Sequence, residues 1–317
     1  MKKWLKGIGL VTFLFIFLAA CSTDAPGSED AAEKESEGDT GNEEVTIGFS
    51  VSTLNNPFFV TLADGTEAAA EEEGYKIITV DAQDDPSKQL NDIEDLLQQN
   101  IDVLIVNPVD SDAIVSAVES ANDANIPVIT VDRSSEGGEV VAHIASDNIS
   151  GGEMAGQFIV DKLGGEGKVV ELEGIPGASA TRERGEGFHN IIDEIDGIEV
   201  VAKQTANFDR TEGLSVMENI IQGNDSIDAV FAHNDEMALG AIEALEAENM
   251  LDDVIVVGFD ATDDAISAVA EGRMDATIAQ LPELLGERSI IVVKQVLNGE
   301  DVEEFVPVEL ELVTKRR

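Results

Sequence analysis

The sequence predicts an α/β protein of two similar lobes, each a doubly wound parallel sheet with helices on both faces. From Glu44 onward, short and almost uninterrupted apolar runs alternate with amphipathic helical stretches. Such runs are typical of strands that are buried on both faces of a parallel sheet. A weak internal repeat also relates two parts of the chain. Repeated βα units of this kind favour a doubly wound sheet in each lobe.

The apolar runs give the expected strands in chain order. They cover residues 45–52, 76–82, 102–108, 127–133, 140–146, 168–174, 198–204, 228–234, 253–259 and 275–281. Helical patterns such as PSKQLNDIEDLLQQ and EMALGAIEALEAE lie between most of them. In the repeat, a helix, a strand beginning Ile-Asp, a second helix and a strand ending in Asp follow in order. Asp102 to Asp132 spans 30 residues and Asp228 to Asp260 spans 32.

The first 20 residues have the pattern of an export signal. Three lysines precede an apolar run, Ile8 to Ala20, that is too short for a permanent membrane-spanning helix. The run ends in Leu-Ala-Ala-Cys21, which resembles the lipobox of bacterial lipoproteins and implies a lipid on Cys21. A signal peptide with an incidental cysteine is the alternative. Residues 21–44 are then an acidic tether, because they lack the apolar side chains that could offset the entropy of ordering.

The net charge excludes a polyanionic partner. The chain has 65 Asp and Glu against 19 Lys and Arg, a net charge of −46, so nucleic-acid binding is not expected. Without the signal and the tether, the folded part still carries about −41. A generic acidic protein is one interpretation. We favour adaptation to high salt, a halophilic surface on which carboxylates keep water bound and ions screen their repulsion.

The composition also argues against metal and enzyme chemistry. One cysteine and three histidines are too few for a thiolate or histidine metal centre. No G-x-S-x-G elbow occurs, and the glycine-rich segments 164–168 and 184–188 lack the spacing of a nucleotide-binding motif. The acidic pairs Asp84-Asp85 and Asp263-Asp264 are interpreted as solvated loop carboxylates, with Asp84 outside the binding cleft. We expect no metal, no cofactor and no enzymatic activity.

Polar and aromatic residues follow many of the expected strands. Ligands of open α/β sheets bind beyond the carboxyl ends of the strands, so two such lobes would share a cleft lined by these residues. The cleft candidates are Ser52 to Phe59, Asn107, Asp132-Arg133, Ser146 to Asn148, Asn234-Asp235, Phe259-Asp260 and Gln280. Carboxylates, amides, guanidinium groups and phenyl rings suit a polyol such as a sugar.

Two of these choices have simpler alternatives. Phe58 and Phe59 could be core residues in the first turn of a helix that begins near Pro57. Arg133 could belong to an ordinary surface ion pair, which contributes little to stability.

Eight segments resemble the sugar-binding (type I) solute-binding proteins of ABC importers. From about Val45 to Val313 they are VSTLNNPFFV, NIPVITVDR, HIASDN, RERGEGF, FDR, NDEMALGA, VVGFD and TIAQLP. The resemblance implies the type I periplasmic binding protein fold and a set of sugar contacts. These contacts would be Asn56, Phe58, Phe59, Asp132, Arg133, Arg184, Phe208, Asn234, Asp260 and Gln280. His233 and Ala261 stand where glutamine and glycine are expected, next to the implied contacts Asn234 and Asp260.

The resemblance also implies an arrangement of lobes and a role. A three-segment hinge would lie near residues 146–147, 280–281 and 309–310. It would separate a first lobe of residues 45–146 plus 281–309 from a second of 147–280 plus 310–317. The implied protein is a monomer, exported and held by its lipid at the outer face of the cytoplasmic membrane. It would capture D-ribose or a close monosaccharide for an ABC permease and its ATPase.

Two other protein classes use the same fold. A transcription regulator of the lactose-repressor family would need a basic helix-turn-helix head, and residues 1–44 have a signal and an acidic tether instead. A sugar-sensing receptor that feeds a chemotaxis or quorum-type partner is the remaining alternative, because a permease and a sensor can recognise the same closed form.

Overall fold

The computed structural model describes residues 44–315. The predicted signal, the lipidation site Cys21 and the tether up to residue 43 lie outside the described residues. Within the described range, no helix has the length and apolar character needed to cross a membrane.

The elements alternate strand and helix along most of the described chain. They are β1 (Thr46–Val51), α1 (Pro57–Glu72), β2 (Lys76–Asp81), α2 (Pro86–Leu97), β3 (Val103–Val106), α3 (Val115–Asp123), β4 (Val128–Val131), β5 (Ala142–Ser146), α4 (Asn148–Leu163), β6 (Gly167–Glu173), α5 (Ser179–Ile192), β7 (Ile198–Thr205), α6 (Arg210–Gly223), β8 (Ala229–Ala232), α7 (Asp235–Ala247), a short 3₁₀ helix (Leu251–Asp253), β9 (Ile255–Asp260), α8 (Asp263–Glu271), β10 (Ala276–Ala279), α9 (Pro282–Leu297), β11 (Phe305–Val308) and β12 (Glu311–Thr314).

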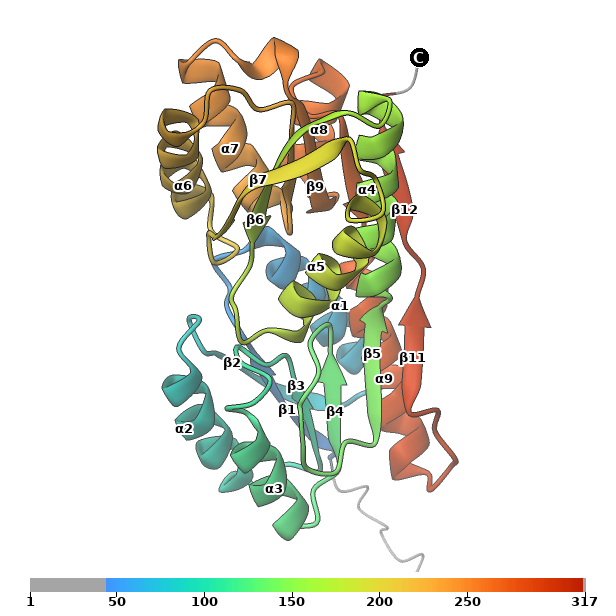
Figure 1. Ribbon diagram of the computed structural model, residues 1–317. Coiled ribbons are helices and arrows are strands. Elements are labelled where there is room, and N and C mark those ends of the chain that lie inside the picture. The colour runs from blue at the N-terminus through green and yellow to red at the C-terminus, as the bar shows by residue number, and fades with distance from the viewer. Residues whose placement is uncertain (1–43, 316–317) are drawn as a thin grey trace, which may run out of the picture. The chain divides into compact units, whose positions relative to one another are not determined.

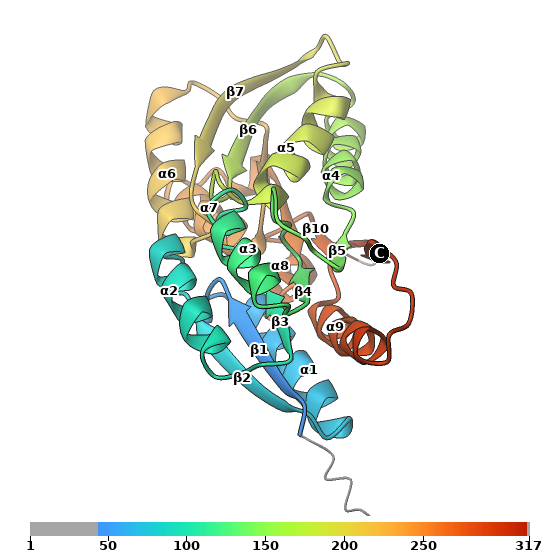
Figure 2. The ribbon, with the colours of Figure 1, turned by 90° about the horizontal axis from the view of Figure 1, so that it is seen from below.

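One six-stranded sheet has the spatial order β11-β5-β4-β3-β1-β2, and all its neighbouring strands are parallel. Phe49 and Leu62 belong to the buried cluster between this sheet and helices α1 and α9. Leu104 and Val118 belong to the cluster on the opposite face, under α2 and α3. The two helix pairs lie on opposite sides of the sheet (Figure 2). We call this sheet with α1, α2, α3 and α9 the first lobe.

The other six-stranded sheet has the order β12-β10-β9-β8-β6-β7 and is parallel except for β12, which runs antiparallel to β10. Helices α6, α7 and α8 cover one face, around Met217 and Val256. Helices α4 and α5 cover the other, around Ile159 and Phe231. We call this sheet with α4 to α8 the second lobe (Figure 1). The predicted class, two doubly wound α/β lobes, is confirmed.

All ten expected strands are present, and two further strands were not expected. Strands β11 and β12 each lie at the edge of a sheet. Phe305 is exposed and Pro307, which has no N–H, lies within β11, so this strand lacks both the apolar run of a central strand and a full set of N–H donors. A proline is tolerated at a sheet edge, where a ladder hydrogen bond is not required.

The chain passes from one sheet to the other three times. These crossings lie between β5 and α4 at residues 146–148, between β10 and α9 at residues 279–282, and between β11 and β12 at residues 308–311. Each lobe therefore combines segments that are far apart in the sequence.

Candidate functional site

A pocket lies between the two lobes, and all ten residues predicted to contact the ligand line it. Its lining consists of Asn56, Phe58, Phe59, Asp132, Arg133, Ala180, Arg184, Phe208, Asn234, Asp260 and Gln280. Ala180 is the one residue of this set that the sequence did not suggest. It precedes Arg184 by one helical turn in α5 and so shares its face. A methyl group carries no chemical signal by which it could have been found.

The first turn of α1 brings three side chains to the pocket. The Asn56 side chain caps the helix, accepting a hydrogen bond from the Phe58 N–H at 2.9 Å. The rings of Phe58 and Phe59 meet edge to face, with centroids 5.2 Å apart. They are only 4% and 3% exposed and belong to the buried cluster of the first lobe. The core interpretation of these rings is therefore right, and yet both also line the pocket.

Asp132 and Arg133 follow directly after β4 and are buried, with 3% and 2% exposure. A surface ion pair is therefore the wrong interpretation of Arg133. Its Nη1 donates to the carbonyl oxygen of Pro108 at 3.2 Å, and its Nε lies 3.7 Å from Asp132 Oδ2. The guanidinium carbon is 5.0 Å from the ring centre of Phe59 and 5.1 Å from that of Phe208. These contacts hold the guanidinium group between aromatic rings of both lobes.

Arg184 is the buried cation on the other side of the pocket. Its Nη1 donates to the His233 carbonyl oxygen at 2.6 Å and its Nε donates to Asn148 Oδ1 at 2.9 Å. Asp260 Oδ1 lies 3.8 Å from Nη1 of the same guanidinium and accepts a hydrogen bond from Gln280 Nε2 at 2.9 Å. Arg184, Asp260 and Gln280 thus form one connected polar wall.

Phe208 and Asn234 complete the second-lobe wall. Phe208 has a φ of +60°, which is unusual for a bulky residue and indicates a conformation imposed by its surroundings. Its ring lies over Gly174, where an added Cβ would come within 2.0 Å of the ring. A glycine at position 174 is therefore required for this position of the Phe208 ring. Asn234 caps α7 by accepting from the Met237 N–H at 3.0 Å, and its Nδ2 donates to the Phe208 carbonyl oxygen at 3.3 Å.

The charges in the pocket wall balance. Two carboxylates, Asp132 and Asp260, face two guanidinium groups, Arg133 and Arg184. Burial raises the pKa of Asp132, while Arg133 and Arg184 oppose that rise. Burial likewise raises the pKa of Asp260, with Arg184 opposing it. A neutral ligand leaves this balance undisturbed, whereas a charged one would place an unpaired charge in a closed, poorly solvated site.

Two buried polar atoms of the pocket residues have no hydrogen-bond partner within the described part of the chain. They are Nε of Arg133, a donor, and Oε1 of Gln280, an acceptor. Since buried polar groups are almost always paired, both are candidates for bonds to a ligand. A hydroxyl group can accept from the first and donate to the second.

One expectation about the acidic loops was wrong. Asp84 does not lie outside the cleft: it lines a groove that adjoins the pocket and shares Arg133 with it. Burial raises the pKa of Asp84, and the charge of Arg133 opposes the rise. Of the other residues in these acidic pairs, Asp85 caps α2 and Asp264 pairs with Arg210 at 2.9 Å. The position of Asp84 depends on how its loop folds back, which the sequence alone did not indicate.

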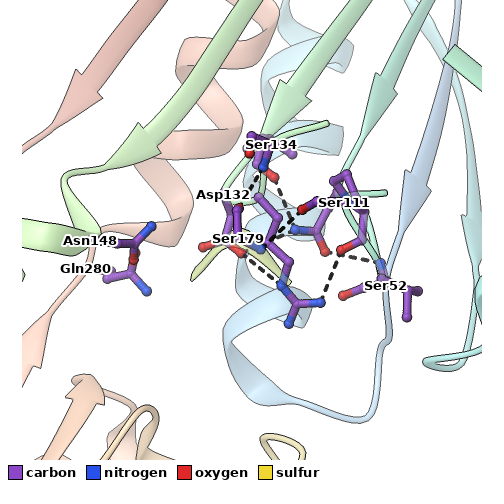
Figure 3. A network of polar contacts seen from close by, with 12 residues as sticks. Ser52, Ser111, Asp132, Ser134, Asn148, Ser179 and Gln280 are labelled. Carbon is purple, nitrogen blue, oxygen red and sulfur yellow. Dashed lines mark hydrogen bonds and ion pairs between the residues drawn. The ribbon is translucent and has the colours of Figure 1, made fainter. Parts of the chain in front are cut away.

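A row of small polar residues joins the two lobes beside the pocket. The Ser134 N–H donates to Ser179 Oγ at 2.9 Å, and the Ser179 N–H donates to Ser111 Oγ at 3.1 Å. The Ser111 N–H donates to the Gly177 carbonyl oxygen at 2.9 Å. Figure 3 shows the three serines in one network near Asp132, with Gln280 to one side. Serines in turns and at helix starts are ordinary, so the sequence carried no signal for this network.

We call Ser111, Ser134 and Ser179 the serine rim. Two further contacts between the lobes lie beside it. Glu136 of the first lobe forms an ion pair with Arg182 of the second. A Cβ at Gly177 would come within 2.0 Å of Asp110 Oδ2, so a larger residue here would displace the Asp110 side chain. The rim and the pocket together connect the lobes through polar groups that meet only when the lobes are close.

The two departures from the expected motifs lie outside the pocket lining, His233 buried behind it and Ala261 in a neighbouring groove. His233 is fully buried and its Nε2 lies 2.9 Å from Glu171 Oε1. Burial lowers the pKa of His233, with Glu171 opposing the change. Ala261 has a φ of +56°, a conformation that glycine adopts more easily. Neither side chain lines the pocket.

Comparison with protein families gives one match over most of the chain. A family model described as "Periplasmic binding protein domain" matches residues 47–301. The ribose import binding protein of Bacillus subtilis (strain 168) is 51% identical over 313 residues, which is 98% of this chain and 99% of that protein. The ribose import binding protein of Escherichia coli (strain K12) is 50% identical over 271 residues, 86% of this chain and 91% of that protein.

Solved structures show the same architecture. An ABC transporter solute-binding protein from Bacillus halodurans C-125 with bound myo-inositol has a TM-score of 0.82 and 41% identity, covering 87% of this chain and 96% of that one. A periplasmic solute-binding protein from Actinobacillus succinogenes 130z with bound D-allose has a TM-score of 0.80 and 29% identity. The match covers 86% of this chain and 98% of that one. In both cases the bound molecule that is named is a neutral polyol.

Proposed function

The chain belongs to the periplasmic binding protein family, and from this premise we propose that it binds D-ribose and delivers it to an ABC permease. The observation that carries the proposal is the convergence of ten residues from distant segments on one charge-balanced pocket between the lobes. The chain is 51% and 50% identical in sequence to two ribose import binding proteins, over 99% and 91% of their length, and this supports the choice of sugar.

The polar and the aromatic side chains of the pocket contact different parts of the sugar. Asp132 and Arg133 on one side, and Arg184 and Asp260 on the other, bind ring hydroxyls through charge-assisted hydrogen bonds. The rings of the pocket phenylalanines lie against the C–H faces of the sugar and exclude water. Because a hydroxyl both donates and accepts, one sugar can satisfy the carboxylates and the guanidinium groups together.

Binding is coupled to closure of the lobes. The ligand contacts residues of both lobes, so it stabilises the closed form over an open one. The rim formed by Ser111, Ser134 and Ser179 adds contacts that exist only in the closed form. The proposed lobes, residues 45–146 plus 281–309 and 147–280 plus 310–317, turn about the three chain crossings. The permease recognises the closed form, and its ATPase supplies the energy of transport, so the binding protein needs no enzymatic activity.

The test is calorimetric titration of the mature chain with a panel of neutral polyols. We expect one D-ribose per chain, bound more tightly than D-allose or myo-inositol. Absence of heat with D-ribose, under conditions in which the protein is folded, would refute the assignment of the ligand. Tighter binding of another sugar would replace D-ribose and leave the transport role standing.

The N-terminal segment supports a lipid anchor at Cys21. Cys21 is the only cysteine and follows Leu-Ala-Ala, so replacing it with alanine removes the one acceptor for the lipid. We expect Cys21→Ala to move the protein from the membrane fraction to the soluble fraction without changing its affinity for the sugar. Fractionation of cells that produce the two forms measures this. A variant that stays with the membranes as before excludes the lipoprotein assignment.

The acidic surface supports adaptation to high salt. A net charge of about −41 on the folded part destabilises the compact state by self-repulsion, and salt screens that repulsion. We expect the melting temperature to rise with NaCl concentration, by roughly 2 to 4 °C for each kcal/mol recovered. A thermal melt series from dilute buffer to molar NaCl measures it, with KCl as a check that screening is general. A flat or falling series removes the halophilic interpretation.

We also propose that the chain is a monomer. Light scattering in the same buffers tests this.

A further inference from the structure

Asn107 lies directly behind Asp132, at the carboxyl end of β3, and does not line the pocket. It is fully buried. Its Nδ2 donates to Asp132 Oδ2 at 3.2 Å and to the Val131 carbonyl oxygen at 3.1 Å. Its Oδ1 accepts from the Ser52 N–H at 3.2 Å. The side-chain amide thus links the ends of β1, β3 and β4.

The turn that carries Asp132 is a tight one. Asp132 has a φ of +64°, in the left-handed region that few non-glycine residues adopt. The Arg133 N–H donates to the Val131 carbonyl oxygen at 2.7 Å, across Asp132, as in a γ-turn. The same carbonyl accepts from Asn107. An unfavourable backbone conformation persists only where its surroundings hold it, and Asn107 supplies two of the bonds that do so here.

Asn107 is itself held in place from helix α2. Nε2 of Gln89 donates to the Asn107 carbonyl oxygen at 2.9 Å and to Ser50 Oγ at 3.2 Å. Oε1 of Gln89 accepts from the Val109 N–H at 2.8 Å. Gln89 is buried and has no bond to Asp132. The two amides therefore form successive layers, and only the nearer one reaches the binding carboxylate.

We propose that Asn107 is a positioning residue for the sugar: its amide N–H holds Asp132 Oδ2 and so fixes the orientation in which the carboxylate meets the sugar. This inference rests on the proposed function, because it assigns a role within the same site. A donor is essential at this point. An amide stabilises the ionised carboxylate through a hydrogen bond, whereas an acceptor in its place would repel it.

The test is Asn107→Asp, which keeps the shape of the side chain and removes the donor. Raising the pH removes protons from the two adjacent carboxylates, so we expect D-ribose affinity to fall by roughly a hundredfold relative to the unaltered protein at about pH 9. At about pH 5.5 the pair retains a shared proton more fully and one carboxyl again donates, so the deficit should shrink at least about tenfold. The deficit is the ratio of the two dissociation constants at each pH. The other charged groups near Asp132 are Arg133, Arg184, Glu183 and Asp260, and all are unchanged in both proteins.

Asn122→Asp is the matched control. Asn122 also bonds to backbone through both ends of its amide, accepting from the Glu139 N–H at 2.7 Å and donating to the Glu139 carbonyl oxygen at 2.9 Å. It is absent from the pocket lining. We expect this control to bind D-ribose as the unaltered protein does at both pH values.

The outcomes separate the inference from the function. If the unaltered protein fails to bind D-ribose, the proposed ligand is wrong whatever the variants do. If it binds and Asn107→Asp binds equally well, or more weakly by the same factor at both pH values, the positioning role is refuted and the function stands. Thermal melts accompany each titration. If Asn107→Asp is unfolded, Asn107→Ala carries the test: an affinity within about twofold of the unaltered protein refutes the inference, and a loss of about tenfold or more supports it.

Discussion

Asp132→Ala should weaken D-ribose binding by roughly a hundredfold or more, since it removes two charge-assisted hydrogen bonds of about 1.5 to 3 kcal/mol each. The carboxylate is buried in the pocket wall beside Arg133. Without this carboxylate, a sugar hydroxyl loses its hydrogen-bond partner and the buried guanidinium of Arg133 loses its neighbouring negative charge. Calorimetric titration gives the affinity, and a thermal melt of the same sample shows whether the fold is retained.

The control for this variant is Asp252→Ala, an exposed aspartate in the short 3₁₀ helix of the second lobe. It should leave both affinity and melting temperature unchanged. Asp84 is unsuitable as a control, because its groove adjoins the pocket and its charge acts on Arg133. An Asp132→Ala protein that binds D-ribose like its parent would show that the assigned contacts are wrong.

Arg184→Met should lower both affinity and stability. The side chain donates to Asn148 and to the His233 carbonyl oxygen and lies beside Asp260. Without it, the buried Asp260 loses the cation with which it pairs, a change that costs about 3 to 5 kcal/mol where such pairs have been broken. We expect D-ribose affinity to fall by roughly a hundredfold and the melting temperature to drop by several degrees.

The pH dependence of the Arg184→Met defect has a definite sign. Burial raises the pKa of Asp260 in the folded protein, and removing Arg184 raises it further. Below the raised pKa the carboxyl is neutral and needs no cation, so the stability defect should be smaller in acid and largest at alkaline pH. Arg273→Met, at a half-buried position of the second lobe outside the pocket, is the matched control and should change neither quantity. Equal melting temperatures for Arg184→Met and its parent at alkaline pH would contradict the assigned ion pair.

The fold class and ten strands were predictable from the sequence because a strand that is buried on both faces of a sheet gives a recognisable pattern in a short segment. Each central strand is an apolar run, and it is followed by polar residues where the sheet ends. Strands β11 and β12 left no such trace. They lie at sheet edges, are partly exposed, and acquire their strand conformation from pairing with β5 and β10. A pairing partner that is distant in the chain is invisible to local pattern analysis.

The identities of the ten pocket residues were likewise available from their motifs, whereas their surroundings were not. The link between Ser111 and Ser179 joins residues 68 positions apart. The contact of Asn107 with Asp132 spans 25 positions and depends on which way an amide points at the end of a buried strand. The groove position of Asp84 follows from a loop in which Gln83 and Asp84 both have positive φ.

The sequence by itself determined the doubly wound class, the acidic composition and the types of residue that line the pocket, because composition, periodicity and strand-end position can be read from the sequence without the fold. The tertiary structure alone decided that Arg133 is buried rather than exposed, that Phe58 and Phe59 serve both core and pocket, and that a serine rim closes beside the site. These features arise when the lobes meet. Burial, charge balance and hydrogen-bond direction depend on neighbours supplied by other segments, and only the folded chain brings those segments together.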